Sequence, residues 1–182
     1  MIYGKNIDLR MIKQSDLDQI IELNSDARER GEYLGLYLMN DVAYRKRYQE
    51  TGLWNDEAGT LAITDKNGRL LGDIGFFAGV RYLPGCEIGY GILRREDRGK
   101  GYTTEALQLF TAYLFDIKQN IHRIEVHADV DNIGSRRVAE KAGYTFEGIK
   151  RDAVFVRGGF RDLALYSILR GECPKLKDIM QL

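Results

Sequence analysis

The sequence lacks the marks of a secreted, membrane or nucleic-acid-binding protein. Two cysteines, Cys86 and Cys173, among 182 residues cannot make a disulfide framework, which predicts a reduced, cytoplasmic protein. No apolar run is long enough to span a bilayer, and the N-terminus has no signal-peptide pattern, so we expect no membrane partner. The 27 basic and 27 acidic residues cancel, which argues against a nucleic-acid partner bound through bulk charge.

Histidine is also scarce. His122 and His127, the two histidines of the sequence, are five residues apart in an expected strand. An odd spacing places them on opposite faces of a strand, where they cannot share a ligand. We therefore predict no metal site.

Apolar residues make up 44% of the chain, enough for one core, and we expect a single domain over residues 1–182. Alternation and turn signals predict strands at residues 6–12, 61–64, 70–78, 86–93, 121–126, 144–156 and 160–169. Helical spacing predicts helices that begin near Ser15, Asp41, Tyr102 and Asn132. We expect residues 26–40 to form a loop or a broken helix and the tail after Gly171 to pack weakly. The order of elements predicts an α/β fold, a mixed sheet with helices on both faces.

The most informative stretch runs from Arg98 through Gly99, Lys100 and Gly101 to the start of a helix. It follows the expected strand 86–93. The first N–H groups of a helix have no internal partner and carry partial positive charge, and glycine lets the backbone approach an anion closely. This stretch is therefore a predicted phosphate site. The Walker pattern and the dinucleotide Gly-x-Gly-x-x-Gly pattern are both absent, which weakens nucleotide triphosphate and nicotinamide as ligands.

A second block follows the strand at 121–126. It reads Asn132-x-x-Ser135-x-Arg137-Val138-Ala139-Glu140-Lys141-x-Gly143-Tyr144. Together with Glu87-Ile88-Gly89-Tyr90 and the glycine stretch, it resembles the GNAT superfamily of N-acyltransferases. The branch that it is most similar to includes the ribosomal-protein N-terminal (alanine/serine) acetyltransferases. The resemblance covers about residues 7–170.

The resemblance implies a mostly antiparallel mixed sheet and acetyl-CoA as cosubstrate. It implies that backbone N–H groups at the helix start hold the pyrophosphate, and that Asn132 binds the pantetheine arm. It also implies a bulge that separates two strands for the coenzyme. One departure is Glu96, where the superfamily motif usually has Gln or Arg; Arg94, Arg95 or Arg98 can replace it. The expected coenzyme-binding residues are Ile92, Leu93, Arg94, Arg98, Gly99, Lys100, Gly101, Tyr102, Thr103, Asn132, Ser135, Arg137 and Lys141.

The expected chemistry is direct attack of a neutral primary amine on the thioester. Glu87 is the candidate base, with Asp129 as the second candidate, and pairing of Glu87 with an arginine is the structural alternative. Ser135 is the candidate that stabilises the thiolate, with Tyr144 or water as alternatives. Backbone N–H groups at residues 92 and 93 are expected to receive the carbonyl oxygen. A buried Cys86 is favoured over a nucleophile.

The acceptor amine stays open at this point. Trp54, Tyr33 and Tyr37 are candidates for contact with it. The branch favours a protein or peptide N-terminus, but the same fold serves polyamines, aminoglycosides and amino sugars. A catalytically weak acyl-CoA sensor is a further alternative, although the presence of both Glu87 and Ser135 favours catalysis. A homodimer is also left open.

Overall fold

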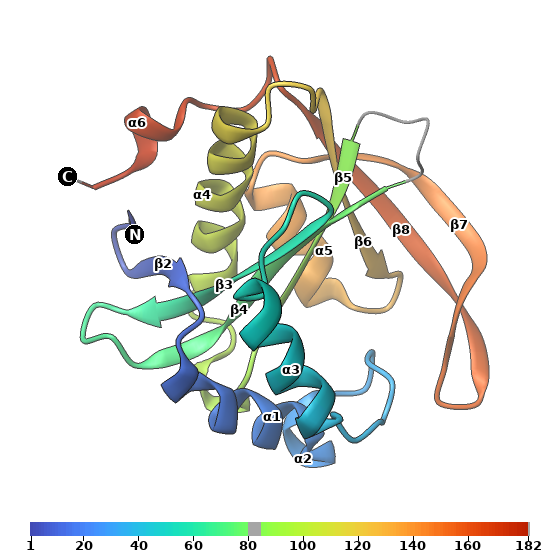
Figure 1. Ribbon diagram of the computed structural model, residues 1–182. Coiled ribbons are helices and arrows are strands. Elements are labelled where there is room, and N and C mark those ends of the chain that lie inside the picture. The colour runs from blue at the N-terminus through green and yellow to red at the C-terminus, as the bar shows by residue number, and fades with distance from the viewer. Residues whose placement is uncertain (80–84, 182) are drawn as a thin grey trace.

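The computed structural model describes residues 1–79 and 85–181, and within these residues eight strands form one sheet (Figure 1). The strand order is β1-β2-β3-β4-β5-β6-β8-β7. The β5–β6 pair is parallel and the other pairs are antiparallel, so the mixed, mostly antiparallel sheet is confirmed. The strands are β1 (Ile2–Tyr3), β2 (Ile7–Met11), β3 (Ala58–Asp65), β4 (Leu70–Ala78), β5 (Gly85–Ile92), β6 (Arg123–Asp129), β7 (Thr145–Val156) and β8 (Gly159–Leu169).

Helices cover both faces of this sheet, as expected. One side carries α1 (Leu17–Ser25), α2 (Ala27–Arg30) and α3 (Asp41–Thr51), and the other carries α4 (Tyr102–Ile117), α5 (Ile133–Lys141) and α6 (Leu176–Ile179). A larger apolar cluster lies under α4 and a smaller one under α1. In the described residues, no helix is both apolar and long enough to cross a membrane.

The long helix α4 anchors the larger cluster. Ala106, Leu107, Phe110 and Leu114 are fully buried, which confirms the spacing by threes and fours. Trp54 packs edge-on against Phe76 and Phe110, with ring centroids 5.3 and 6.3 Å apart. Trp54 is half-buried and packs against the core, and it is not among the described residues that line the cleft, so its expected contact with substrate finds no support.

Three local predictions need correction. Ser15 is not a helix cap, because it lies inside a 3₁₀ turn (Gln14–Asp16) and the helix begins at Leu17. The strand expected at 121–126 begins at Arg123 and continues to Asp129, so His122 lies outside it. The tail after Gly171 is not loosely packed. It forms α6, Leu176 and Met180 pack against the core, and the Gln181 N–H donates to the Tyr3 carbonyl.

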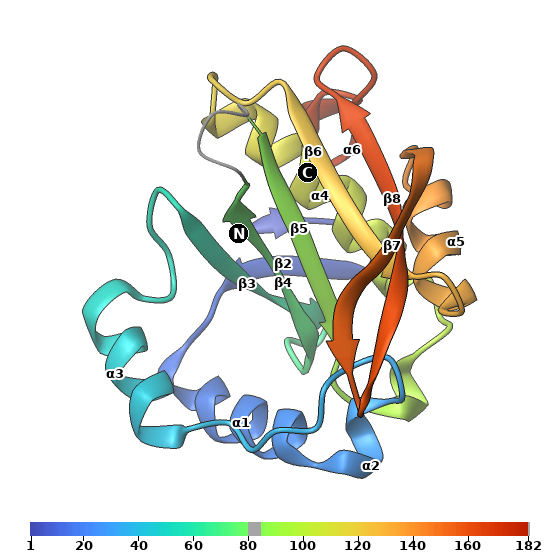
Figure 2. The same cartoon turned by 90° about the vertical axis from the view of Figure 1, so that its right-hand side faces the viewer.

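The parallel strands β5 and β6 pair over three residues and then separate (Figure 2). Pairing ends at Glu87 opposite Glu125, although β5 continues to Ile92 and β6 to Asp129. Over the described residues, β5 keeps an unbroken register with β4 from Cys86 to Ile92. The expected separation is therefore present, but it does not come from a bulge in the β4–β5 pair.

Close contact between β4 and β5 depends on Gly72. An added Cβ there would lie 2.0 Å from the Gly91 carbonyl oxygen, and backbone cannot move aside cheaply. We expect Gly72→Ala to lower the free energy of unfolding by roughly 1–3 kcal/mol or more. Gly89→Ala is the control, since its Cβ would make an ordinary 3.6 Å contact with Phe77. Urea unfolding measures both, and equal stability of the two variants would contradict the packing argument.

Candidate active site

A cleft of about 990 Å³ opens where β5 and β6 separate. Its walls come from β5, β6, the segment that leads into α4, the first turns of α5, the irregular segment after α2, and β7. It contains most of the residues predicted from the sequence. Those that line it are Glu87, Ile92, Arg98, Gly99, Lys100, Gly101, Tyr102, Thr103, Asn132, Ser135, Arg137 and Lys141.

The glycine stretch forms one end of the cleft. Gly99 and Gly101 have φ of 75° and 85°, a left-handed conformation that favours glycine. Apart from each glycine and its two chain neighbours, no described atom lies within 4 Å of a Cβ built on either residue. Because α4 begins at Tyr102, the N–H groups of its first turn have no partner within the helix. The open backbone and the helix dipole fit an anionic phosphate group.

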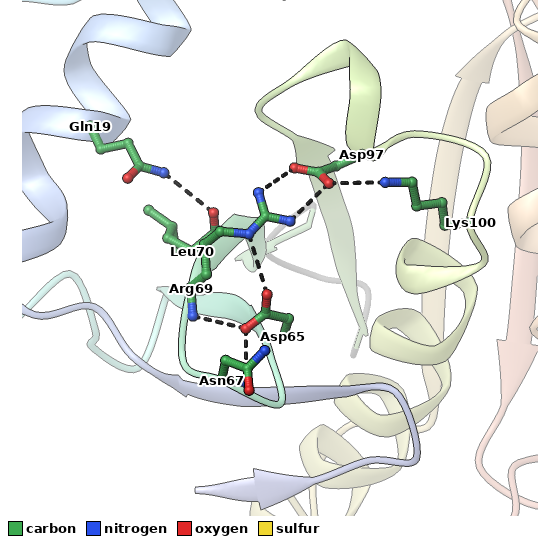
Figure 3. A network of polar contacts seen from close by, with 7 residues as sticks. All are labelled: Gln19, Asp65, Asn67, Arg69, Leu70, Asp97 and Lys100. Carbon is green, nitrogen blue, oxygen red and sulfur yellow. Dashed lines mark hydrogen bonds and ion pairs between the residues drawn. The ribbon is translucent and has the colours of Figure 1, made fainter.

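A buried carboxylate fixes this stretch to the β3–β4 hairpin (Figure 3). Asp97, 2% exposed, accepts two hydrogen bonds from the Arg69 guanidinium, at 2.8 and 2.9 Å, and one from Lys100 at 3.2 Å. Asp65 in turn accepts from Arg69 through the backbone N–H and Nε. The hydrogen bonds from Arg69 hold the pKa of Asp97 at about 2, against an ordinary value of 3.8. Sequence motifs missed Arg69, because it lies 28 residues before its partner.

Two of the predicted coenzyme-binding residues, Leu93 and Arg94, are not among the described residues that line the cleft. Leu93 is buried, and its N–H donates to the Leu71 carbonyl, so it has no N–H to offer a ligand. Antiparallel pairing alternates the direction of successive N–H groups, so the Ile92 N–H points to the other edge, where β6 has separated. Of the two expected backbone donors, Ile92 is the one that faces the cleft.

The first turn of α5 carries the serine. Asn132 caps this helix by accepting the Ser135 N–H at 3.0 Å, so its capping role is observed. The Ser135 hydroxyl is 3.0 Å from the hydroxyl of Tyr90 on β5. Burial raises the pKa of Tyr90 to about 12, so this phenol stays protonated at neutral pH. Tyr90 was missed as a functional residue, because strand alternation gave its face but not its contact with α5.

Glu87 lies at the point where β5 and β6 separate, and its side-chain partner is a histidine instead of an arginine. Its Oε2 is 3.0 Å from Nδ1 of His127, and Nε2 of that ring is 2.6 Å from Nζ of Lys150 on β7. An ammonium can only donate, so Lys150 donates to Nε2 and His127 donates its Nδ1 proton to Glu87. The carboxylate is thus oriented by two further side chains from β6 and β7.

Of the other candidate residues, some line the cleft and others are buried away from it. Tyr33 and Tyr37 line the cleft as expected. Tyr144 is buried, and its hydroxyl pairs with Thr111 at 2.6 Å, so it is not placed to act in the cleft. Burial raises the pKa of the Cys86 thiol to about 12, which keeps it a packed, unreactive side chain.

Comparison with known proteins agrees with this geometry. Residues 6–145 match the family model described as the acetyltransferase (GNAT) domain. The chain belongs to the GNAT family of acetyltransferases. It is 34% identical to YjcK of Bacillus subtilis (strain 168), named as a probable N-acetyltransferase, over 93% of this chain and 97% of that protein.

Two further similar proteins have names that state a substrate. YdaF of Bacillus subtilis (strain 168), provisionally named a ribosomal N-acetyltransferase, is 30% identical over 93% of this chain and 94% of its own. The crystal structure of the Vibrio cholerae spermidine N-acetyltransferase, in complex with CoA and spermine, superposes with a TM-score of 0.76. At 20% identity over 92% of this chain and 97% of that chain, this likeness supports the fold.

The lowered pKa of Asp97 predicts how the stability of the folded protein changes at acidic pH. A carboxylate whose pKa falls from 3.8 to about 2 on folding stabilises the folded state above about pH 4, and this contribution is lost as the pH falls toward 2. We expect Asp97→Asn to lower the melting temperature at pH 7 and to reduce the difference from wild type at pH 2–3. Exposed Asp56→Asn is the control and should change little. A difference in melting temperature between Asp97→Asn and wild type that stays constant from pH 7 to pH 2 would contradict the lowered pKa of Asp97.

Proposed function

We propose that this GNAT enzyme transfers an acetyl group from acetyl-CoA to the N-terminal amine of a protein or peptide. The observation that carries the choice of acceptor is the mouth of the cleft on the side of α1–α3. There the cleft is lined by Tyr33, Leu34 and Tyr37 of the segment after α2 and by residues 154–156 of β7. This surface is apolar and aromatic, which suits an extended peptide.

Exposed apolar side chains at the mouth support the same choice. Leu34, Tyr37 and Phe155 are 50–62% exposed. Arg30 also lines the cleft, and its guanidinium lies 4.0 Å from the ring centroid of Tyr37. A polyamine would gain little from this apolar surface, whereas peptide side chains can cover it.

The opposite side of the sheet suits the coenzyme. The glycine stretch and the start of α4 would hold the pyrophosphate, and Arg137 and Lys141, one turn apart on α5, would meet a further phosphate. The Ile92 N–H would meet the arm that runs along β5. Acetyl-CoA supplies the activated acetyl group. The open space over Gly99 and Gly101 is the observation that fits it.

Two groups of side chains would carry out the two proton transfers of the reaction, one from the amine and one to the sulfur. The acceptor α-amine has an ordinary pKa of about 7.7–8.0, so much of it is protonated at neutral pH and must lose a proton before attack. Glu87, held by His127, would take that proton directly or through water. As the C–N bond forms and the C–S bond breaks, the Tyr90–Ser135 pair would donate to the sulfur. Retention of both groups favours catalysis over a sensor role.

An amine panel tests the choice of acceptor. With acetyl-CoA and thiol detection, we expect peptides with a free N-terminus to give kcat/KM at least about tenfold above spermidine, an aminoglycoside or an amino sugar. The same peptides with a blocked N-terminus are the control and should release no thiol. A small amine that outperforms every peptide would overturn the proposed acceptor and leave the acetyltransferase assignment intact.

The base assignment makes a separate prediction. Glu87→Gln keeps the shape of the side chain but cannot take a proton, so we expect a loss of about 100-fold in kcat/KM near pH 6 and a smaller loss near pH 9. Glu125→Gln is the matched control. Glu125 lies opposite Glu87 in register and pairs with Arg123 at 2.8 Å, but it is not among the residues that line the cleft. Parallel pH profiles for Glu87→Gln and wild type would remove Glu87 as the base.

A further inference from the structure

Asp129 is a buried carboxylate on the acceptor side of the cleft, the side of α1–α3 that we assign to the acceptor amine. It is the last residue of β6, 6% exposed, and it lines the cleft. Its Oδ1 accepts the Asp131 N–H at 2.9 Å, but its Oδ2 has no hydrogen-bond partner among the described residues. A buried carboxylate oxygen without a donor is unfavourable, so a ligand that supplies a donor there gains binding energy.

The face of β6 on which Asp129 lies indicates the side of the cleft from which such a ligand would reach it. Residues 125, 127 and 129 share one face of β6, and the His127 ring on that face contacts Glu87. The intervening residues, Val126 and Ala128, are buried on the other face, and Val126 belongs to the cluster under α4. Asp129 therefore faces the acceptor side, where Tyr33 donates its hydroxyl to the Asp131 carbonyl at 2.9 Å.

The local charge indicates a cation. Arg161 on β8 is shared between two carboxylates: its Nη1 lies 3.6 Å from Asp129 Oδ2 and 3.7 Å from Asp131 Oδ2. Two carboxylates and one guanidinium leave one net negative charge at this point. An ammonium group would balance it and would also provide the missing donor.

We propose that Asp129 binds the acceptor amine in its ammonium form and so acts as a specificity-determining residue, while Glu87 takes the proton. This inference rests on the proposed function and gives Asp129 a binding role distinct from that of a base. The order of events follows: the ammonium is bound at Asp129, and one proton leaves its nitrogen for Glu87, directly or through water. The neutral amine then attacks, the C–N bond forms and the C–S bond breaks. The second proton leaves the nitrogen for water, and the departing sulfur takes a proton from the Tyr90–Ser135 pair, which water reprotonates.

Steady-state kinetics of Asp129→Asn test this role. We expect KM for the acceptor to rise about tenfold or more, with acetyl-CoA affinity by calorimetry unchanged. Asp131→Asn is the matched control, because it removes the same charge beside the same arginine but its side chain is 73% exposed. It should stay within about twofold of wild type. Equal effects of the two variants, or weaker acetyl-CoA binding in Asp129→Asn, would overturn the inference.

A second measurement uses the wild-type enzyme. A peptide with a hydroxyl in place of its N-terminal amine cannot carry the positive charge, so we expect it to inhibit at least about tenfold more weakly than the acceptor peptide binds. Equal binding would contradict an ammonium site. If wild type acetylates a small amine and no peptide, the proposed acceptor fails, and the same comparison of Asp129 and Asp131 variants on that small amine still decides the role of Asp129.

Discussion

The early end of the β5–β6 pairing is the constraint on which the site depends. After Glu87 and Glu125, the two strands no longer share hydrogen bonds, and β6 pairs with β8 alone. Strand edges with free N–H groups are normally liabilities, but here the freed edge of β5 faces a cleft that a ligand can enter. The separation also sorts the neighbouring side chains: Tyr90 turns toward α5 and Glu87 toward β6 and β7. Strand alternation and this separation thus place the groups that we propose for the coenzyme and for the acceptor on opposite faces of a single sheet.

The Asp97 cluster has a cost for binding as well as a benefit. It fixes the glycine stretch by joining it to Arg69, which the β3–β4 hairpin orients (Figure 3). The same carboxylate holds Lys100, and part of that positive charge is then already balanced before any phosphate arrives. If this stretch holds a phosphate as we propose, recognition would depend more on the backbone N–H groups of α4 than on the Lys100 side chain. In the proposed site the glycine conformations would then matter more than the count of basic residues in the stretch.

The sequence predicted local features well, because their causes are local. The turn at Gly99 and Gly101, the cap at Asn132 and the buried face of α4 each follow from residues within a few positions of one another. Contacts between distant segments could not be derived in this way. Arg69 with Asp97, Tyr90 with Ser135 and His127 with Glu87 depend on strand order and register. Leu93 shows the same limit, since its N–H is used by Leu71 on a neighbouring strand.

Hydrogen bonds join the mouth of the cleft, formed by the segment after α2 and by β7, to the rest of the cleft. Arg157, at the β7–β8 turn, donates to the Leu34 carbonyl at 3.2 Å and also to the Gly31 carbonyl. Figure 2 shows the segment after α2 passing beside the tip of this hairpin. Tyr33 joins the same segment to the residues that precede α5. Because these contacts involve backbone carbonyls, the segment's shape is held while its side chains remain free to differ. In the function that we propose, changes at Leu34, Tyr37 or Phe155 would therefore alter the choice of acceptor without disturbing Glu87 or the Tyr90–Ser135 pair.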